Sequence, residues 1–306
     1  NDKRIANAAY LNEGLKDVVM YLEFWDELTE KDWRDMLLLR QRLIDGELDE
    51  KRGPIEVDDI RNEAARCLFL NRGLRTRVSD DKYFLLVRQA GAKLDWLWKE
   101  EDGKLQLTYR TTYNLLPRWD RMIGPKSHGQ DLIFGEFKDA VTLCRAYDKA
   151  MTEDPEGDHS QILRQLAGLL YRNRDNKVKK HTRRLPYDVD GAMEQLRRGE
   201  RLPEWFVWGV YAWFSFFCEY LATGVFIIDG EEVCFAPVFG GGDSEKSGDG
   251  SRGNLGLNDI ALTLAESDVF GGFDDVLHTP LMRVMMKLLH DKQHAEEIEK
   301  RLKMKH

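Results

Sequence analysis

The side chains best suited to acid–base chemistry gather in the segment "SHGQDLIFGEFKD" and shortly after it. His128, Asp131 and Glu136 follow one another there, and His159 lies further along the chain. Imidazole and carboxylate groups act as general acids and bases when their surroundings tune their pKa. If the chain is an enzyme, we expect its site near these four residues. However, a carboxylate early in a helix also stabilises the helix dipole, so Glu136 needs no catalytic explanation.

Two histidines, His290 and His294, are spaced to share one face of the last helix. Such an i, i+4 pair can hold a metal ion when further ligands complete the site. The surrounding "HDKQHAEE" is highly charged and implies no third ligand. We therefore interpret the pair as part of a solvated helix face and expect no metal.

Two further segments invite a phosphate-binding interpretation. "KVKKHTRR" (177–184) could bind phosphates, but acidic segments elsewhere can balance it, which favours a solvated connector. The glycine-rich "FGGGDSEKSGDG" lacks the GxxxxGKS pattern of a P-loop and the helix that should follow directly. With no specific catalytic motif present, we expect a non-enzymatic protein without a cofactor.

Composition and charge narrow the classes of protein. The chain has 306 residues, of which 42% are hydrophobic and 33% charged, and its formal net charge is −8. These values are typical of a globular protein, and the acidic balance disfavours a general nucleic-acid role. The four cysteines form no CxxC pair, and the first residues lack an apolar signal-peptide core. We expect buried, reduced thiols and a cytoplasmic protein.

The segment 204–223, "EWFVWGVYAWFSFFCEYLAT", is the most aromatic of the chain. Its uncharged part ends at Glu219 and spans roughly 21 Å as a helix, too short for a bilayer core of about 30 Å. A helix that is apolar on every face must be covered. We expect Trp208, Phe214 and Phe217 to be buried, beneath helices near 188–198, 257–267 and 281–296. Trp205, Tyr211 and Tyr220 are the candidates for contact with a partner.

The periodicity of the chain predicts a mainly α-helical globular bundle with two short β-hairpins. Alternating residues flank Asp102-Gly103 and Asp229-Gly230, which places hairpins near 94–109 and 225–238. We expect an N-terminal helical lobe over 1–175 and a C-terminal lobe over 176–306, the latter built around the helix at 204–223. The segment 240–254 is rich in Gly, Ser and Asp, which is typical of a flexible loop.

Several ordered segments carry a family resemblance: "GQDLIFGEFKDAVTLCRAYDKAM", then "ILRQLAGLLYR" and "RRLPYD", and near the end "LGLNDIALTLAESDVFGGFDDVLHTPLMRVMMKLLH". This series resembles a family of helical proteins encoded in the tail-gene regions of phages and prophages. The chain departs from the pattern at Gly256, where a large aromatic residue is expected, and in the length of the insertion at 240–254.

The resemblance implies a phage assembly or structural role, similar to a tail-assembly chaperone or a virion-associated protein, and it carries over no catalytic residue. The partners it implies are other phage structural proteins, including a coiled-coil tape-measure-like protein, or further copies of the chain. Two alternatives stay open: a helical binding or regulatory module of a bacterial host, and an enzyme with a site near His128, Asp131, Glu136 and His159.

Overall fold

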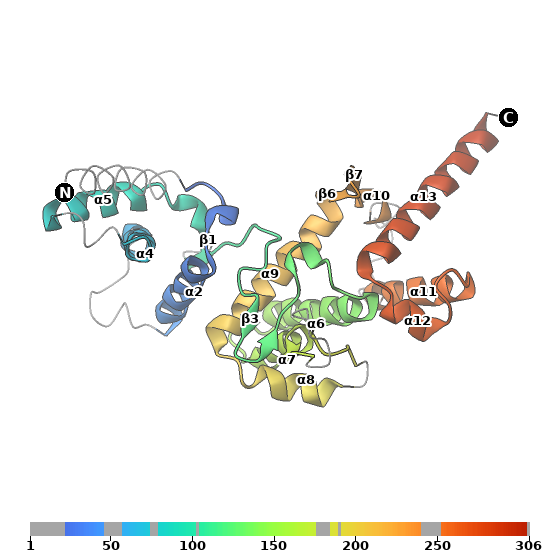
Figure 1. Ribbon diagram of the computed structural model, residues 1–306, viewed down its shortest axis with the longest axis horizontal. Helices are drawn as coiled ribbons and strands as arrows, with labels where there is room; N and C mark the ends of the chain where they lie inside the picture. Colours follow the sequence, from blue (N-terminus) through green and yellow to red (C-terminus); the bar gives the residue numbers. More distant parts are fainter. Residues whose placement is uncertain are drawn as a thin grey trace, which may run out of the picture. The chain divides into compact units, whose positions relative to one another are not determined.

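The computed structural model of the protein describes residues 22–45, 57–73, 79–101, 104–175, 184–188, 191–239 and 252–304. In this part the chain is mainly helical, with a few short antiparallel strand pairs, which confirms the predicted fold class (Figure 1). The chain divides into two compact units. Unit 1 comprises residues 1–111 and 204–212, and unit 2 comprises residues 112–203 and 213–306.

Unit 1 packs helices around a cluster of aromatic rings. Its elements are η1 (Trp25–Glu27), α2 (Glu30–Ile44), α4 (Val57–Asn71), α5 (Asp80–Gly91), η3 (Asp95–Leu97) and the hairpin of β1 (Trp98–Glu101) and β2 (Lys104–Leu107). The rings of Trp25 and Trp33 meet edge to face at 4.9 Å, and Tyr109 lies 4.7 Å from Trp33. This hairpin confirms the one predicted near 94–109.

A buried carboxylate ties α2 to α4. Thr29 and Asp32 form the capping box at the start of α2 that their spacing predicts. Asp32 is completely buried and also accepts bonds from Asn71 at 2.9 Å and from both Nη atoms of Arg72 at 2.9 and 3.0 Å. Burial alone would raise the pKa of Asp32, but the hydrogen bonds from Arg72, Thr29 and Asn71 outweigh it and lower that pKa.

Unit 2 holds most of the remaining helices. Its elements are β3 (Arg118–Trp119), β4 (Met122–Ile123), η4 (Ser127–Gly129), α6 (Phe134–Glu153), α7 (Ser160–Leu170), β5 (Arg172–Asn173), α8 (Ala192–Gly199), β6 (Val225–Ile228), β7 (Glu231–Cys234), α10 (Ala236–Phe239), α11 (Arg252–Glu266), α12 (Phe273–His278) and α13 (Leu281–Lys303). The hairpin of β6 and β7 confirms the second predicted one. At its turn Asp229 and Gly230 both have positive φ, as a two-residue Asp-Gly turn requires.

A small three-stranded sheet lies where the sequence indicates only a loop. In "LPRWDRMIGPKSHGQD", β3 and β4 pair antiparallel, and β5 adds to β4 with Met122 opposite Asn173. Strands of two residues are too short to show an alternating pattern, so periodicity misses them.

The predicted lobe boundary at 175/176 falls inside unit 2. β5 joins the sheet just before this point, and α8, which follows it, packs closely on α7. The contact is close because glycines face it: a Cβ at Gly168 would collide with the carbonyl of Gln195, and one at Gly199 with that of Arg164. The segment around 112–203 therefore holds together across the expected boundary.

The aromatic helix α9 (Glu204–Thr223) contributes its first residues to unit 1 and the rest to unit 2. Phe214 and Phe217 are completely buried, as predicted. Trp208, in contrast, is only half-buried; the guanidinium of Arg40 lies 3.7 Å from its ring centroid, so a cation covers this face rather than the apolar core we expected.

In unit 2 the buried rings of α9 pack on α6, which is not one of the three helices expected to cover them. The ring of Phe137 lies 6.0 Å from Phe214 and 6.3 Å from Phe217. Trp213 stacks on Phe217 at 5.8 Å, and its indole N–H donates to the carbonyl of Thr112. α9 is therefore part of the core of unit 2 from Trp213 onward.

The predicted loop at 240–254 is shorter than expected. α11 begins at Arg252, so the last residues assigned to the loop are helical. Residues 240–251 lie outside the described part of the chain.

We predict that Phe217→Ala lowers the free energy of unfolding by about 3–5 kcal/mol, the usual cost of truncating a buried aromatic ring. Phe216→Ala is the matched control, since Phe216 is the next residue and only half-buried. Urea denaturation of both variants measures the difference. Equal losses would show that burial at Phe217 is not what stabilises this part of α9.

We further predict that Asp32 makes stability depend on pH in the acid range. Because its pKa is lower in the folded than in the unfolded chain, its contribution is present above the unfolded value of about 4 and is lost as pH falls through the folded value. Unfolding free energies of the wild type and of Asp32→Asn should differ most near neutral pH and converge below pH of about 4. Glu30→Gln, an exposed substitution in the same helical turn, should leave the pH profile unchanged.

Candidate functional site

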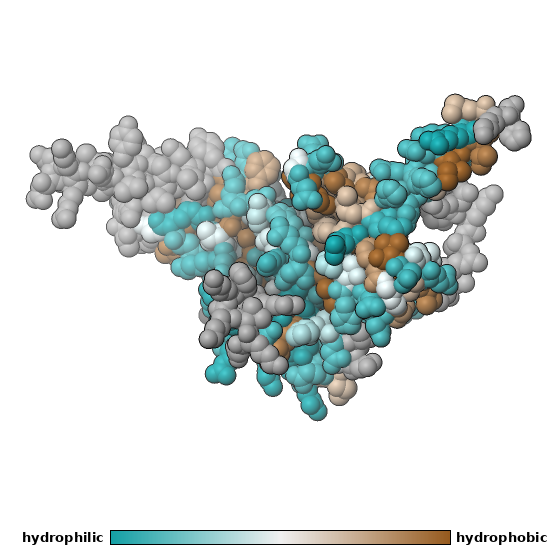
Figure 2. All heavy atoms as spheres, turned by 45° about the vertical axis from the view of Figure 1, so that its right-hand side comes forward, coloured by the Kyte–Doolittle hydropathy of each residue, from teal (hydrophilic) through white to brown (hydrophobic). Residues whose placement is uncertain are grey.

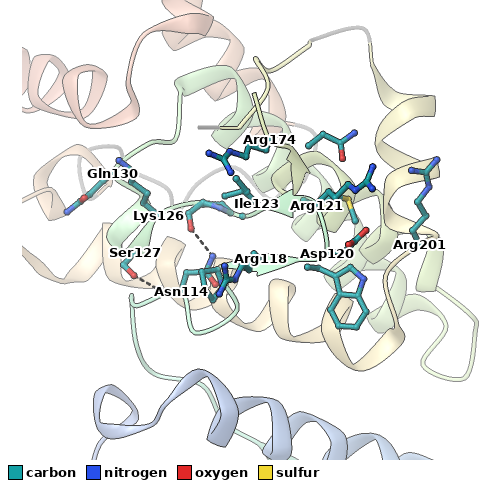
Figure 3. Close-up of a pocket in the computed structure, with 16 residues that line it drawn as sticks. Asn114, Arg118, Asp120, Arg121, Ile123, Lys126, Ser127, Gln130, Arg174 and Arg201 are labelled. Carbon is teal, nitrogen blue, oxygen red and sulfur yellow. Dashed lines mark hydrogen bonds between the residues drawn. The ribbon is translucent and has the colours of Figure 1, made fainter. Parts of the chain in front are cut away.

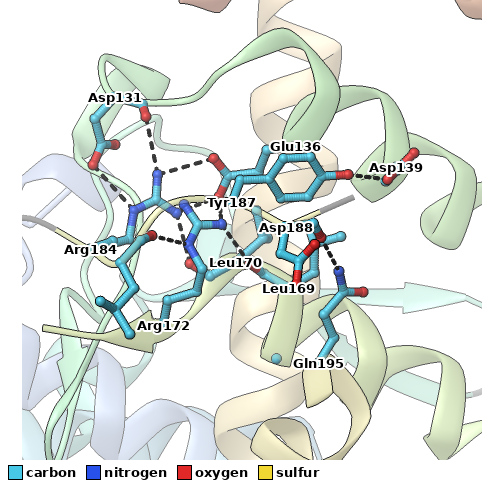
Figure 4. Close-up of polar contacts among 12 residues, drawn as sticks. Asp131, Glu136, Asp139, Leu169, Leu170, Arg172, Arg184, Tyr187, Asp188 and Gln195 are labelled. Carbon is cyan, nitrogen blue, oxygen red and sulfur yellow. Dashed lines mark hydrogen bonds and ion pairs between the residues drawn. The ribbon is translucent and has the colours of Figure 1, made fainter. Parts of the chain in front are cut away.

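Of the four candidate catalytic residues, Glu136 has the most unusual environment. Its side chain is completely buried in the first turn of α6. The carboxylate accepts a bond of 2.9 Å from Nη1 of Arg172, and it is bonded to both Nη atoms of Arg184 (Figure 4). Asp131 joins the same cluster, with its Oδ2 3.3 Å from Nε of Arg184. The structure thus brings Glu136 and Asp131 together through one guanidinium.

The two arginines also donate hydrogen bonds to the last carbonyl groups of α7. The last carbonyls of a helix have no partner within it and carry partial negative charge. Arg172 donates to the carbonyl of Leu169 at 3.0 Å, and Arg184 donates to that of Leu170 at 2.8 Å. Two carboxylates and two helix-terminal carbonyls therefore meet two buried guanidiniums, and the formal side-chain charges balance.

The pKa shifts agree with this arrangement. Burial lowers the pKa of Arg172 despite the attraction of Glu136. The pKa of Arg184 shifts in the opposite direction. Burial is again the largest single effect and opposes the charge, but the attraction of Glu136 and Asp131 together outweighs it and raises the pKa above its usual value. Beside the cluster, burial and then the hydrogen bond to Asp139 raise the pKa of Tyr187. All these groups are engaged with one another, which is the pattern of a structural ion cluster.

The two candidate histidines do not join the cluster. His128 has a positive φ of 59° in η4, and its Nδ1 lies 2.6 Å from the hydroxyl of Thr112. His159 precedes α7, and its Nε2 lies 2.7 Å from the carbonyl of Asp154. Each ring is positioned by its own local partner. Of the four residues expected near one site, the structure therefore brings only Asp131 and Glu136 together, and the two histidines lie apart from them.

The aromatic residues proposed for partner contact, Trp205, Tyr211 and Tyr220, are each half-buried. At about 100° per residue, Tyr211 lies on a different face of α9 from the other two. Tyr220 is engaged within unit 2: its hydroxyl donates to the carbonyl of Val225 at 2.7 Å, and its ring lies 5.2 Å from Phe226. They do not form one continuous patch, and their role in binding stays a prediction.

His290 and His294 stack at 6.4 Å with nearly parallel rings. Within the described residues, no group of three or more His, Cys, Asp or Glu side chains is placed to hold a metal ion. The cysteines are less buried than expected, since only Cys144 is fully buried. Burial nevertheless raises the pKa of Cys67 to about 11, so this thiol stays neutral at physiological pH.

A different surface emerges at the end of α13. The first part of this helix is packed through Leu281, Val284, Met285 and Leu289. From His290 to Met304 every residue except Lys292 is exposed. At about 1.5 Å per residue, residues 290–303 extend roughly 21 Å beyond the last buried side chain. Figure 1 shows the end of α13 extending from the rest of unit 2, and Figure 2 shows hydrophobic residues on this extension.

The exposed part of α13 keeps an apolar row at heptad spacing. Ala295, Ile298 and Leu302 follow one another at intervals of three and four residues. They are in register with Leu281, Val284 and Leu288, and the charged Asp291 occupies the position between the two sets. Ile298 and Leu302 are 46% and 57% exposed and lie on the same helical face, so a partner can reach both side chains. We call Ala295, Ile298 and Leu302 the α13 seam. Charged residues flank it and pair within the helix, as in Glu299–Lys303 at 2.6 Å.

The start of α13 is fixed to the start of α6. Ile133 and Pro280 form an antiparallel bridge, the amide of Leu281 donates to the carbonyl of Leu132, and the amide of Phe134 donates to that of Thr279. α13 therefore begins beside the start of α6, the helix that carries Glu136. The charged residues at this helix end predict only a solvated face, and the spacing of Ala295, Ile298 and Leu302 is the sequence signal that reveals the seam.

Comparison of the chain with protein-family models, curated proteins and solved structures finds no match. Among the described helices, none combines the length and the apolar character that a membrane span requires.

We predict that Glu136→Gln lowers the free energy of unfolding by about 3–5 kcal/mol, because it leaves two buried guanidiniums without their shared charge. Asp131→Asn should cost less, since the side chain of Asp131 is 26% exposed and water can replace part of its bond. Urea denaturation of the two variants measures the comparison. A stable Glu136→Gln variant would contradict the structural assignment of this carboxylate.

Proposed function

We propose that the protein is a non-enzymatic assembly or structural protein of a phage or mobile element, which acts through protein–protein contacts. The observation that supports this best is the α13 seam, an apolar row at heptad spacing on a helix that extends beyond its own core. The resemblance to proteins of phage tail-gene regions points the same way. The proposal gives Glu136 no catalytic role, because its carboxylate is buried and already bonded to Arg172 and Arg184.

The partner that fits the seam is a helix with matching heptad spacing. Knobs-into-holes packing requires apolar side chains at alternating intervals of three and four residues on both helices. The seam runs from Ala295 to Leu302, little more than one heptad, whereas three or four heptads usually sustain a coiled coil. A long coiled-coil protein suits it, because such a partner contributes its own stable helix and the seam only adds to it. We place the encounter in the cytoplasm of a bacterial host, before or during assembly of the particle.

Gene position provides the first test. A gene for a long coiled-coil tape-measure protein beside the gene for this chain would support the proposal. The two proteins would then be co-expressed and analysed by size-exclusion chromatography with light scattering. We expect a complex whose mass equals the sum of the two components.

The variant that tests the seam is Ile298→Asp/Leu302→Asp, which we expect to abolish the complex. It should leave the fold intact, because both side chains are exposed in the free protein. The control is Gln293→Asp/Lys300→Gln, which makes the same change in net charge on the side of α13 away from the seam. No complex with the wild type, or equal behaviour of the two variants, would refute the proposal. A dimer of the chain alone that the seam variant dissolves would identify a second copy as the occupant instead.

A further inference from the structure

An open hollow in unit 2 is lined by cationic side chains. It has a volume of about 1210 Å³ and lies at the three-stranded sheet (Figure 3). Its lining includes five cations and one carboxylate. The cations are Arg118, Arg121, Lys126, Arg174 and Arg201, and the carboxylate is Asp120.

The five cations come from three parts of the chain: the hairpin of β3 and β4 with the loop after it, the end of β5, and the end of α8. Arg118 and Arg121 flank the turn between β3 and β4, where Asp120 has a positive φ of 49°. Arg174 follows β5, and its amide donates to the carbonyl of Arg121. Arg201 lies just after α8, which the close packing at Gly168 and Gly199 holds against α7. The tertiary structure therefore adds Arg174 and Arg201 to three cations that are close together in the sequence.

The wall of the hollow is held by a buried polar network. The side chain of Asn114 donates to the carbonyl of Pro125 at 2.8 Å and accepts from the amide of Leu116 at 2.9 Å. The hydroxyl of Tyr171 donates to the carbonyl of Leu116. These bonds hold the segment that carries Arg118, Arg121 and Lys126, so this part of the positive surface exists before any ligand arrives.

These cations are available to a ligand. All five residues are exposed, and none of their side chains forms an ion pair with a described residue. This differs from Arg172 and Arg184, close in sequence to Arg174, whose charges are used by Glu136 and Asp131. Cations gathered at one hollow repel one another, and an anion that binds among them removes that repulsion.

The size and chemistry of the hollow favour an extended polymer of phosphates. Its volume exceeds the roughly 300–1,000 Å³ of pockets that enclose a small ligand. In Figure 3 the labelled cations are distributed around the hollow and do not converge on one point. Four of the five are arginines, whose planar guanidinium binds phosphate through two bonds and also stacks on bases. Trp119 lines the same hollow, and aromatic rings beside a basic groove are the usual platform for unpaired bases.

We infer that this hollow binds the backbone of a single-stranded nucleic acid. The acidic net charge of the whole chain argues against a general attraction to nucleic acid, but a local site depends on the charges around it. The inference is independent of the α13 seam, which lies on other residues.

The test is fluorescence anisotropy of the full chain with a labelled oligothymidylate of about 20 nucleotides, longer than the site of a typical single-strand binding module. Affinity should fall with salt, with a slope of about −0.7 in log–log form per phosphate neutralised. Arg118→Glu/Arg121→Glu should weaken binding at least about tenfold, since it reverses two charges at the hollow. Lys82→Glu/Arg88→Glu makes the same net-charge change on exposed residues of α5 and should change affinity by less than about twofold.

A second variant, Arg174→Gln/Arg201→Gln, keeps the sheet and the turn unaltered and should also weaken binding. Circular dichroism melting of each variant shows that it is folded. The inference is overturned if the wild type does not bind the oligonucleotide, or if the α5 variant loses as much affinity as the hollow variants. It is also overturned if a polyglutamate peptide binds more tightly than the oligonucleotide, which would assign the hollow to an acidic protein segment.

Discussion

The position of Glu136 between Arg172 and Arg184 is the constraint on which much of unit 2 depends. One buried carboxylate at the start of α6 holds two guanidiniums that also satisfy the terminal carbonyls of α7. Removing any member would leave a buried charge or a buried carbonyl without a partner, and the desolvation cost of such groups is large. The cluster therefore fixes the end of α7, the strand β5 that follows it, and the return of the chain at Arg184.

From this cluster the structure extends to the two surfaces that we propose to be functional. β5 completes the small sheet and carries the chain to Arg174, so the basic hollow begins a few residues from the buried arginines. α13 starts beside α6 through the bridge of Ile133 and Pro280. Arg172 and Arg184 are buried and paired with carboxylates, whereas Arg174, close to them in sequence, is exposed and forms no ion pair with a described residue.

The aromatic helix α9 has a simpler role than its composition implies. From Trp213 onward its rings pack on Phe137 and on one another, which is the behaviour of a core. At its first turns the rings of Trp205 and Trp208 face the guanidiniums of Arg34 and Arg40. An amphipathic aromatic side chain can be covered by a cation as well as by apolar groups, so the amount of aromatic surface does not by itself indicate an interface.

The sequence by itself determined the features that depend on local chemistry. Helical periodicity, the capping box of Thr29 and Asp32, and the Asp229-Gly230 turn each involve residues a few positions apart, and the structure has them where they were predicted. The burial of Phe214 and Phe217 followed from an apolar helix without a polar face. The tertiary structure alone decided the rest. Residues of the ion cluster lie up to 53 positions apart, and the hollow combines residues from 114 to 201. No local pattern encodes which arginine will be buried beside Glu136 and which will remain exposed. That outcome depends on how α6, α7 and α8 pack, because burial and long-range pairing exist only after the chain has folded.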